Sequence, residues 1–94
     1  MNINPAGKNV LVIGYGEVGK GVAKFFAQNG SNIIVWDNST QNLAASYFDG
    51  FNPDPEKAFL NKADIIVTCS GDINAFGKDE LSAVKDEVII VNVG

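Results

Sequence analysis

An apolar stretch that runs directly into closely spaced glycines constrains the fold of this chain more than any other feature. Residues 9–13 read Asn-Val-Leu-Val-Ile, a run typical of a strand buried on both faces of a parallel sheet. Gly14, Gly16 and Gly19 follow at once. Apolar residues then recur at helical spacing, and we expect one buried stripe made of Val18, Val22, Phe25 and Phe26. A strand, a glycine turn and a helix in direct succession predict the first half of a βαβ unit.

The alternation of strand and helix continues along the chain. Apolar runs predict strands at 33–36, around 50–52, at 65–69 and at 88–93. Helices are expected from Ser39 or Thr40 to about Phe48, from Asp54, and from Asp79 to Val84. This order predicts an α/β domain of Rossmann type, a parallel sheet of about five strands in the order 3-2-1-4-5 with helices on both faces. With 94 residues in total, we expect residues 1–94 to form a single domain.

Composition and charge argue against several classes of partner. The apolar fraction of 46% and the charged fraction of 19% are those of a globular domain. The net charge is −4 and the seven Lys residues are scattered, so we expect no nucleic-acid partner. No apolar run approaches the ~20 residues of a membrane span, so we expect no membrane partner. A single cysteine, Cys69, and no signal-peptide pattern predict a cytoplasmic location.

The sequence contains no histidine, which removes the usual general base, the commonest metal ligand and every Ser-His or Cys-His nucleophile. We therefore expect no catalytic residue within this chain. No carboxylate spacing indicates a metal site either. Cys69, at the end of a predicted strand, is interpreted as a half-buried thiol rather than a reactive one.

The glycines form the pattern G-x-G-x-x-G, from Gly14 to Gly19, which we call the glycine loop. Its place between a buried strand and a helix is the one that dinucleotide binding requires. Gly14 permits a tight turn, Gly16 leaves room for a pyrophosphate, and Gly19 lets the helix approach the sheet. The free N–H groups at the start of the helix then face the diphosphate. The alternative is that these glycines only make a tight strand-to-helix turn.

A carboxylate follows the second predicted strand, as it does in NAD-binding domains. Asp37 lies 23 residues after Gly14, where the acceptor for the adenosine ribose hydroxyls is expected. A carboxylate there repels a 2′-phosphate, which favours NAD over NADP. The alternative interpretation is a solvated aspartate in a loop.

The motifs also resemble a known family, the cofactor domain of S-adenosylhomocysteine hydrolase (adenosylhomocysteinase). The likeness covers nearly the whole chain from Gly7 onward. It rests on the segments 7–10 and 14–21, on Asp37 followed by Asn42, and on the segments Val-Thr-Cys-Ser-Gly at 67–71 and Val-Asn-Val-Gly at 91–94. The Gly-Lys-Gly ending at 19–21 is unusual in other NAD domains of this type, which makes the resemblance specific.

The resemblance implies a set of cofactor contacts. Gly16, Glu17, Val18 and Gly19 would hold the pyrophosphate, Asp37 and Asn42 the adenosine ribose, and Ser70, Gly71 and Asn92 would lie along the nicotinamide half. The family uses bound NAD to oxidise the substrate's ribose 3′-hydroxyl, eliminate or add homocysteine, and reduce the product. This sequence departs from the family at Asp37, where a glutamate is usual, and at Cys69 and Ser70, where threonines are usual.

The family's catalytic residues belong to a substrate domain that this sequence does not include. We therefore expect a cofactor domain cut from a larger enzyme and inactive alone, with the substrate domain as its partner. Two alternatives stay open: a stand-alone NAD-binding or NAD-sensing module, and a fragment of another NAD-dependent dehydrogenase. The fifth predicted strand is almost wholly apolar and would lie at a sheet edge, so we also expect self-association through it.

Overall fold

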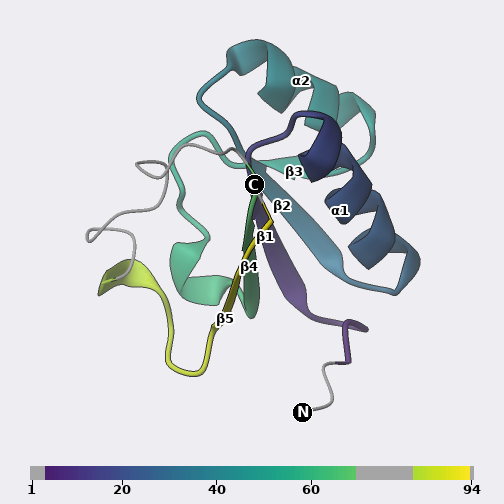
Figure 1. Ribbon diagram of the computed structural model, residues 1–94. Helices are drawn as coiled ribbons and strands as arrows, with labels where there is room; N and C mark the ends of the chain where they lie inside the picture. Colours follow the sequence, from purple (N-terminus) through teal and green to yellow (C-terminus); the bar gives the residue numbers. More distant parts are fainter. Residues whose placement is uncertain (1–3, 70–81, 94) are drawn as a thin grey trace.

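Strand β1 (Asn9–Ile13) lies at the centre of a parallel sheet in the computed structural model, which describes residues 4–69 and 82–93 (Figure 1). The sheet order is β3-β2-β1-β4-β5, and every neighbouring pair is parallel. The other strands are β2 (Asn32–Trp36), β3 (Asn52–Pro53), β4 (Ile65–Thr68) and β5 (Ile89–Asn92). The predicted parallel sheet of five strands in the order 3-2-1-4-5 is confirmed. Because all strands are parallel, their carboxyl ends lie along the same end of the sheet, which we call the carboxyl edge.

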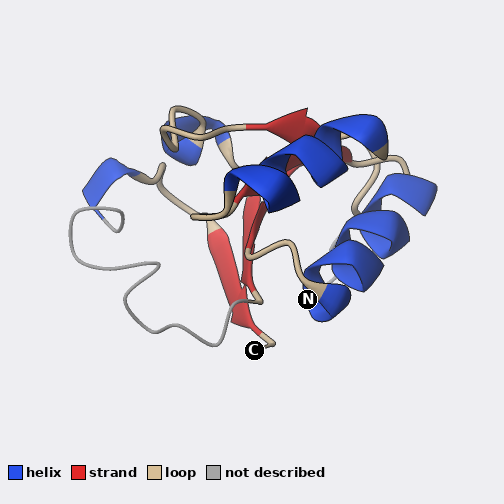
Figure 2. Ribbon diagram, turned by 90° about the horizontal axis from the view of Figure 1, so that it is seen from above, coloured by secondary structure: helices blue, strands red, loops and turns tan. Residues whose placement is uncertain are grey.

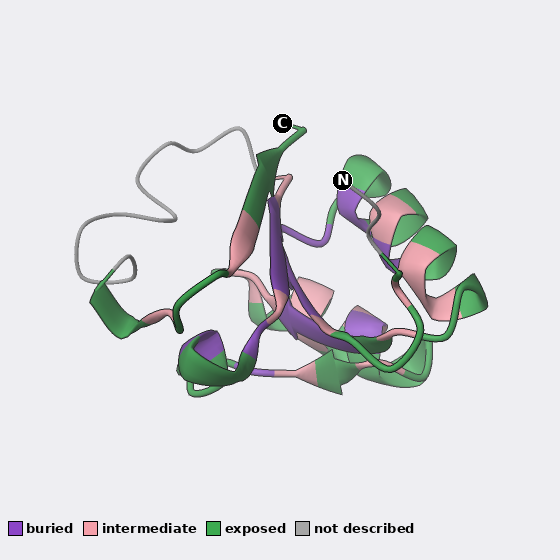
Figure 3. Cartoon of the chain, turned by 90° about the horizontal axis from the view of Figure 1, so that it is seen from below, coloured by how far each residue is buried: buried purple, intermediate pink, exposed green. Residues whose placement is uncertain are grey.

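Helical segments cover both faces of this sheet (Figure 2). Helices α1 (Glu17–Gln28) and α2 (Thr40–Phe48) pack on one face, and the short 3-10 helix η1 (Leu60–Lys62) packs on the other. Alternate residues of β1 point to opposite faces, with Val10 and Val12 toward the α-helices and Leu11 and Ile13 toward η1. All four are fully buried, which explains why β1 is a continuous apolar run (Figure 3).

The buried stripe of α1 differs from the one expected. Val22 and Phe26 pack against the core as predicted, but Val18 and Phe25 are 50% and 58% exposed. The buried positions of the helix are Gly19 and Ala23. These small residues bring the helix axis close to the sheet, so the packed face centres on them. The expectation was therefore wrong for Val18 and Phe25, which lie at the margins of that face.

Helix α2 begins where the sequence predicts. Ser39 is its N-cap, and its hydroxyl accepts a hydrogen bond of 3.2 Å from the Asn42 N–H. Among the described residues, none of the helices is long and apolar enough to cross a membrane.

The expected helix from Asp54 is wrong. Lys57 has a φ of 54°, a left-handed conformation that ends any right-handed helix three residues after Asp54. The Asp54 carboxylate is buried and accepts hydrogen bonds of 2.9 and 3.0 Å from the N–H groups of Ala58 and Phe59. Asp54 thus closes an irregular turn, and η1 is the only regular element that follows before β4. The helix expected at 79–84 lies largely outside the described residues, although residues 82–83 are helical.

Candidate functional site

The glycine loop leaves the carboxyl end of β1 and leads into α1. Gly14 has a φ of 97°, which an L-residue rarely adopts, and its N–H donates a 2.8 Å hydrogen bond to the Trp36 carbonyl at the end of β2. A Cβ at Gly19 would lie 1.9 Å from the Gly14 carbonyl oxygen. The fold therefore requires glycine at both positions, one for its backbone conformation and one for close approach.

The fold does not require glycine at position 16. Gly16 has φ −90° and ψ −155°, an extended conformation open to any residue. A Cβ built there would meet no atom within 4 Å. Gly16 is also the N-cap of α1, so this open space lies at the positive end of the helix.

The start of α1 leaves its first backbone N–H groups without a side-chain cap among the described residues. The first helical hydrogen bond runs from the Lys20 N–H to the Gly16 carbonyl at 2.9 Å. Glu17 and Val18 form the exposed first turn. Uncapped N–H groups and the helix dipole together favour an anionic group at this position.

Asp37 follows β2 and lies directly beside the glycine loop. Its Oδ2 accepts hydrogen bonds of 2.7 Å from the Tyr15 N–H and 3.1 Å from the Asn42 side-chain amide. Its Oδ1 accepts a 2.8 Å bond from the Ser39 N–H. The structure thus brings together Asp37, Asn42 and the loop, three parts of the site expected from sequence.

Asn92 is the last residue of β5 and lies at the opposite end of the carboxyl edge from β2 and Asp37. Its Oδ1 accepts a 2.9 Å hydrogen bond from the Thr68 hydroxyl, and Thr68 lies opposite both Ile13 and Asn92 in the strand register. The expected site therefore extends along the carboxyl edge from β2 to β5. Ser70 and Gly71 lie outside the described residues.

Tyr15 is a feature that motif reasoning missed. It occupies a variable position of the glycine pattern, yet it is only 1% exposed. Its hydroxyl donates a 2.5 Å hydrogen bond to Asp49 at the C-cap of α2. Burial, the hydrogen bond to Asp49 and the charge of Asp49 raise the pKa of Tyr15 well above its ordinary value. The only sequence signal was a large aromatic residue enclosed by two glycines.

Cys69 follows β4 and is partly buried, as its interpretation as a structural thiol predicts. Burial raises the pKa of the thiol, which keeps it protonated and poorly nucleophilic near neutral pH. Within residues 4–69 and 82–93, no group of three or more His, Cys, Asp or Glu side chains is placed to hold a metal ion.

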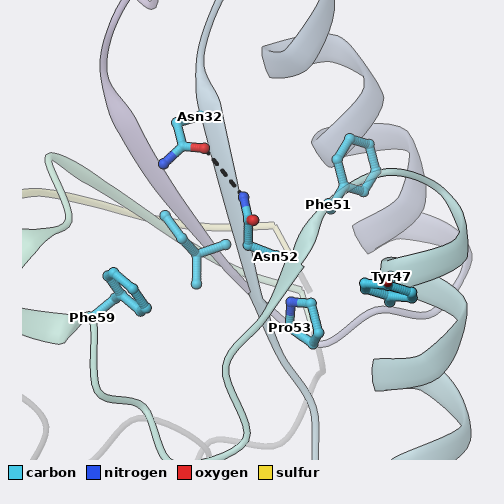
Figure 4. A pocket seen from close by; sticks show the side chains of 7 residues that line it. Asn32, Tyr47, Phe51, Asn52, Pro53 and Phe59 are labelled. Atoms are coloured by element: carbon cyan, nitrogen blue, oxygen red, sulfur yellow. Dashed lines mark hydrogen bonds between the residues drawn. The ribbon is translucent and has the colours of Figure 1, made fainter.

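Two clefts lie away from the glycine loop, beside β3 and α2. The first, of about 420 Å³, is lined by Asn32, Ile34, Tyr47, Phe51, Asn52, Pro53 and Phe59 (Figure 4). The Asn52 amide closes one side of it by donating to the Asn32 side-chain oxygen at 3.2 Å. The second, of about 490 Å³, is almost entirely apolar and shares Tyr47 and Pro53 with the first. Neither cleft is lined by a residue of the expected site.

Comparison with known proteins identifies one family whose model matches almost the whole chain. The model of the family described as S-adenosyl-L-homocysteine hydrolase, NAD binding domain, matches residues 2–94. Adenosylhomocysteinase from Thermotoga maritima is 34% identical over 99% of this chain and 23% of its own length. S-inosyl-L-homocysteine hydrolase from Methanopyrus kandleri is 34% identical over 99% of this chain and 22% of its own length. The chain thus spans less than a quarter of these curated relatives.

A solved structure confirms the fold assignment. The A chain of dipicolinate synthase from Bacillus subtilis superposes with a TM-score of 0.85 and 25% sequence identity. The match covers 96% of this chain and 31% of that one.

Proposed function

Because this chain belongs to the family of NAD-binding domains of S-adenosyl-L-homocysteine hydrolases, with NAD as the cofactor, we propose that it binds NAD across the glycine loop and Asp37. The observation that carries this placement is the open space at Gly16. The fold explains Gly14 and Gly19 without a ligand, but it gives no reason for glycine at position 16. A pyrophosphate that approaches the backbone there supplies one.

The pyrophosphate would be held by the first turn of α1. The N–H groups of the segment 16–19 offer donors at the positive end of the helix, and no side chain among the described residues caps them. Glu17 and Val18 contribute through their backbone, since both side chains are exposed. We therefore expect Gly16, Glu17, Val18 and Gly19 to contact the pyrophosphate through their backbone, while packing against Gly14 separately requires glycine at position 19.

The adenosine ribose would be held by Asp37 and Asn42. A carboxylate offers about four acceptor positions, and the protein occupies three of them at Asp37. One position on Oδ1 is left for a ribose hydroxyl. The same negative charge repels a 2′-phosphate, so NAD is preferred over NADP. Asn92, Ser70 and Gly71 are proposed to line the nicotinamide half.

Substitution of Gly16 provides the sharpest test. Gly16→Ala should leave the unfolding temperature unchanged, because its Cβ meets no atom within 4 Å, and should lower the NAD affinity measured by calorimetry at least about 10-fold by blocking the pyrophosphate. Gly21→Ala is the matched control, since a Cβ there also meets no atom and Gly21 lies one turn further along α1. It should bind NAD as the native chain does. Native affinity in Gly16→Ala would refute the placement.

Substitution of Asp37 tests the ribose contact. Asp37→Ala removes a charge-assisted acceptor and should cost about 1.5–3 kcal/mol of NAD binding free energy, or roughly 10–150-fold in affinity. The preference for NAD over NADP should disappear in the same variant. Equal NAD and NADP affinities in the native chain would contradict this role of Asp37.

In the full-length protein we propose that this domain serves a hydrolase of an S-nucleosylhomocysteine. Bound NAD supplies a reversible hydride acceptor for the substrate's ribose 3′ carbon. Adenosyl and inosyl relatives match this chain at the same 34% identity, so the comparison gives no reason to assign selection of the nucleobase to this domain. The alternative, a stand-alone NAD module, predicts cofactor binding with no second domain encoded beside it.

We further propose that the chain self-associates through β5. This strand lies at the edge of the sheet, and Ile90, Val91 and Val93 are 40–45% exposed. No charge or proline blunts the segment 89–93. Light scattering should show growth in mass with concentration, and Val91→Lys should suppress it. A native chain that stays monomeric at high micromolar concentration would contradict this proposal.

A further inference from the structure

Tyr15 stands between Gly14 and Gly16 in the glycine loop, and its side chain is almost completely buried. Glycines on either side give the backbone little resistance to movement. Besides the bond from the Gly14 N–H to the Trp36 carbonyl, it is therefore the contacts of the Tyr15 side chain and N–H group that hold the start of the glycine loop in place.

The contacts of Tyr15 reach both ends of α2. Before the helix, the Tyr15 N–H donates to Asp37 at 2.7 Å. After the helix, its hydroxyl donates to Asp49, and its ring packs edge-on against Phe51 with 6.2 Å between centroids. One residue thus connects the loop to the turn that carries the ribose acceptor and to the turn that ends α2.

We propose that Tyr15 is a positioning residue for the dinucleotide, and that its hydrogen bond to Asp49, together with the direct bond from its N–H to Asp37, sets the separation between the glycine loop and Asp37. This inference rests on the proposed function, in which one ligand contacts both the loop and Asp37. Binding groups must be held to within about 0.5 Å for such a ligand to satisfy both contacts at once. The Tyr15–Asp49 bond, at the far end of α2, supports the direct bond between the Tyr15 N–H and Asp37 by holding the Tyr15 side chain.

Asp49 acts as an adjustable anchor in this arrangement. It is exposed, so its carboxylate can return to water when the tyrosine hydroxyl is removed. Tyr15→Phe deletes a single oxygen and keeps the ring against Phe51, which preserves the packing of the core. Asp49→Asn keeps an oxygen that can accept the bond, whereas Asp49→Ala does not.

The experiment compares these variants in NAD, ADP-ribose and adenosine binding by calorimetry or NMR titration, with unfolding temperatures recorded in parallel. Tyr15→Phe and Asp49→Ala should each weaken NAD and ADP-ribose about 3- to 10-fold, and the double variant should be no weaker than either single one. Asp49→Asn should restore most of the affinity. Adenosine, which contacts only the Asp37 side, should bind all variants alike. Tyr47→Phe, at a tyrosine 65% exposed on α2, is the matched control and should bind as the native chain does.

Two results would overturn the inference. One is NAD affinity within twofold of native in both Tyr15→Phe and Asp49→Ala. The other is an equal loss of adenosine and ADP-ribose affinity, because that would reflect general loosening of the fold. Failure of the proposed function looks different: the native chain itself would not bind NAD, or Asp37→Ala would bind it unchanged.

Discussion

Gly19→Ala should destabilise the chain strongly, even though alanine is the better helix former. Helix propensity alone predicts a gain of about 1 kcal/mol. Against this, the new Cβ would lie 1.9 Å from the Gly14 carbonyl oxygen and 2.9 Å from its carbon. These are backbone atoms of a tight turn and cannot rotate away, so α1 must retreat from the sheet by more than about 1 Å.

The movement of α1 away from the sheet determines how much free energy of unfolding Gly19→Ala loses. It would separate Ala23 and Val22 from the core that α1 forms with β1 and β2, and overpacking of this kind costs about 1–3 kcal/mol or more. Loss of packing along a whole helix face places Gly19→Ala at the upper end, so we expect a net loss of about 2–3 kcal/mol. In a chain of this size that lowers the unfolding temperature by roughly 8–24 °C.

Urea and thermal unfolding monitored by circular dichroism and by the fluorescence of Trp36, the only tryptophan, measure this effect. Gly21→Ala is the internal standard, because it makes the same chemical change in the same helix with no atom within 4 Å of the new Cβ. It should be neutral or stabilising by up to about 1 kcal/mol. Equal unfolding free energies for the two variants would refute the steric argument for Gly19.

Three other predictions follow from the titratable groups and the composition. Burial and Asp49 raise the pKa of Tyr15, so its contribution to the free energy of unfolding should be fully present below about pH 10 and should fall as the pH rises above it. In alkaline unfolding experiments, Tyr15→Phe should make the free energy of unfolding depend less on pH in that range. The pKa of Asp64 is lowered by its hydrogen bond with Lys85 and by the Asn9 N–H, so its contribution is present above about pH 4 and lost below; Asp64→Asn should cost about 0.5–1 kcal/mol at pH 7 and nothing at pH 2 in urea titrations. The chain alone should release no homocysteine from S-adenosylhomocysteine in a coupled assay, and protein-dependent turnover above background would contradict the expectation that this sequence holds no catalytic residue.

The parts of the fold that were predictable from sequence depend on local rules. Continuous apolar runs marked the central strands because these are buried on both faces, and Ser39 marked the start of α2 because its side chain caps the helix. The strand order follows from the position of the glycine loop at the first crossover. The pairing of Asp37 with the loop was predictable for the same reason, since both follow the carboxyl ends of adjacent strands.

The parts that sequence reasoning got wrong or missed depend on backbone conformations and contacts that no spacing rule encodes. Asp54 carries every local signal of a helix start, yet the left-handed Lys57 and the two N–H groups beyond it direct the chain into a turn. The buried face of α1 differs from the predicted one because Gly19 and Ala23 decide how closely the helix approaches the sheet. The bond between Tyr15 and Asp49 joins residues 34 apart in sequence, and no spacing rule connects them.

The central position of β1 has a consequence for how the chain is made. Within this domain, β1 precedes both of its partners in sequence: it pairs on one side with β2 and on the other with β4, whose last residue is Thr68. The edge of β1 that faces β4 therefore stays unpaired until β4 has been synthesised, after α1, β2 and α2. A growing chain at that stage exposes Leu11 and Ile13, which pack with Leu60, Ala63 and Ile66 in the finished core. Ribosome-associated chaperones should therefore bind nascent chains arrested before β4 emerges more strongly than nascent chains in which β4 has emerged and can pair with β1.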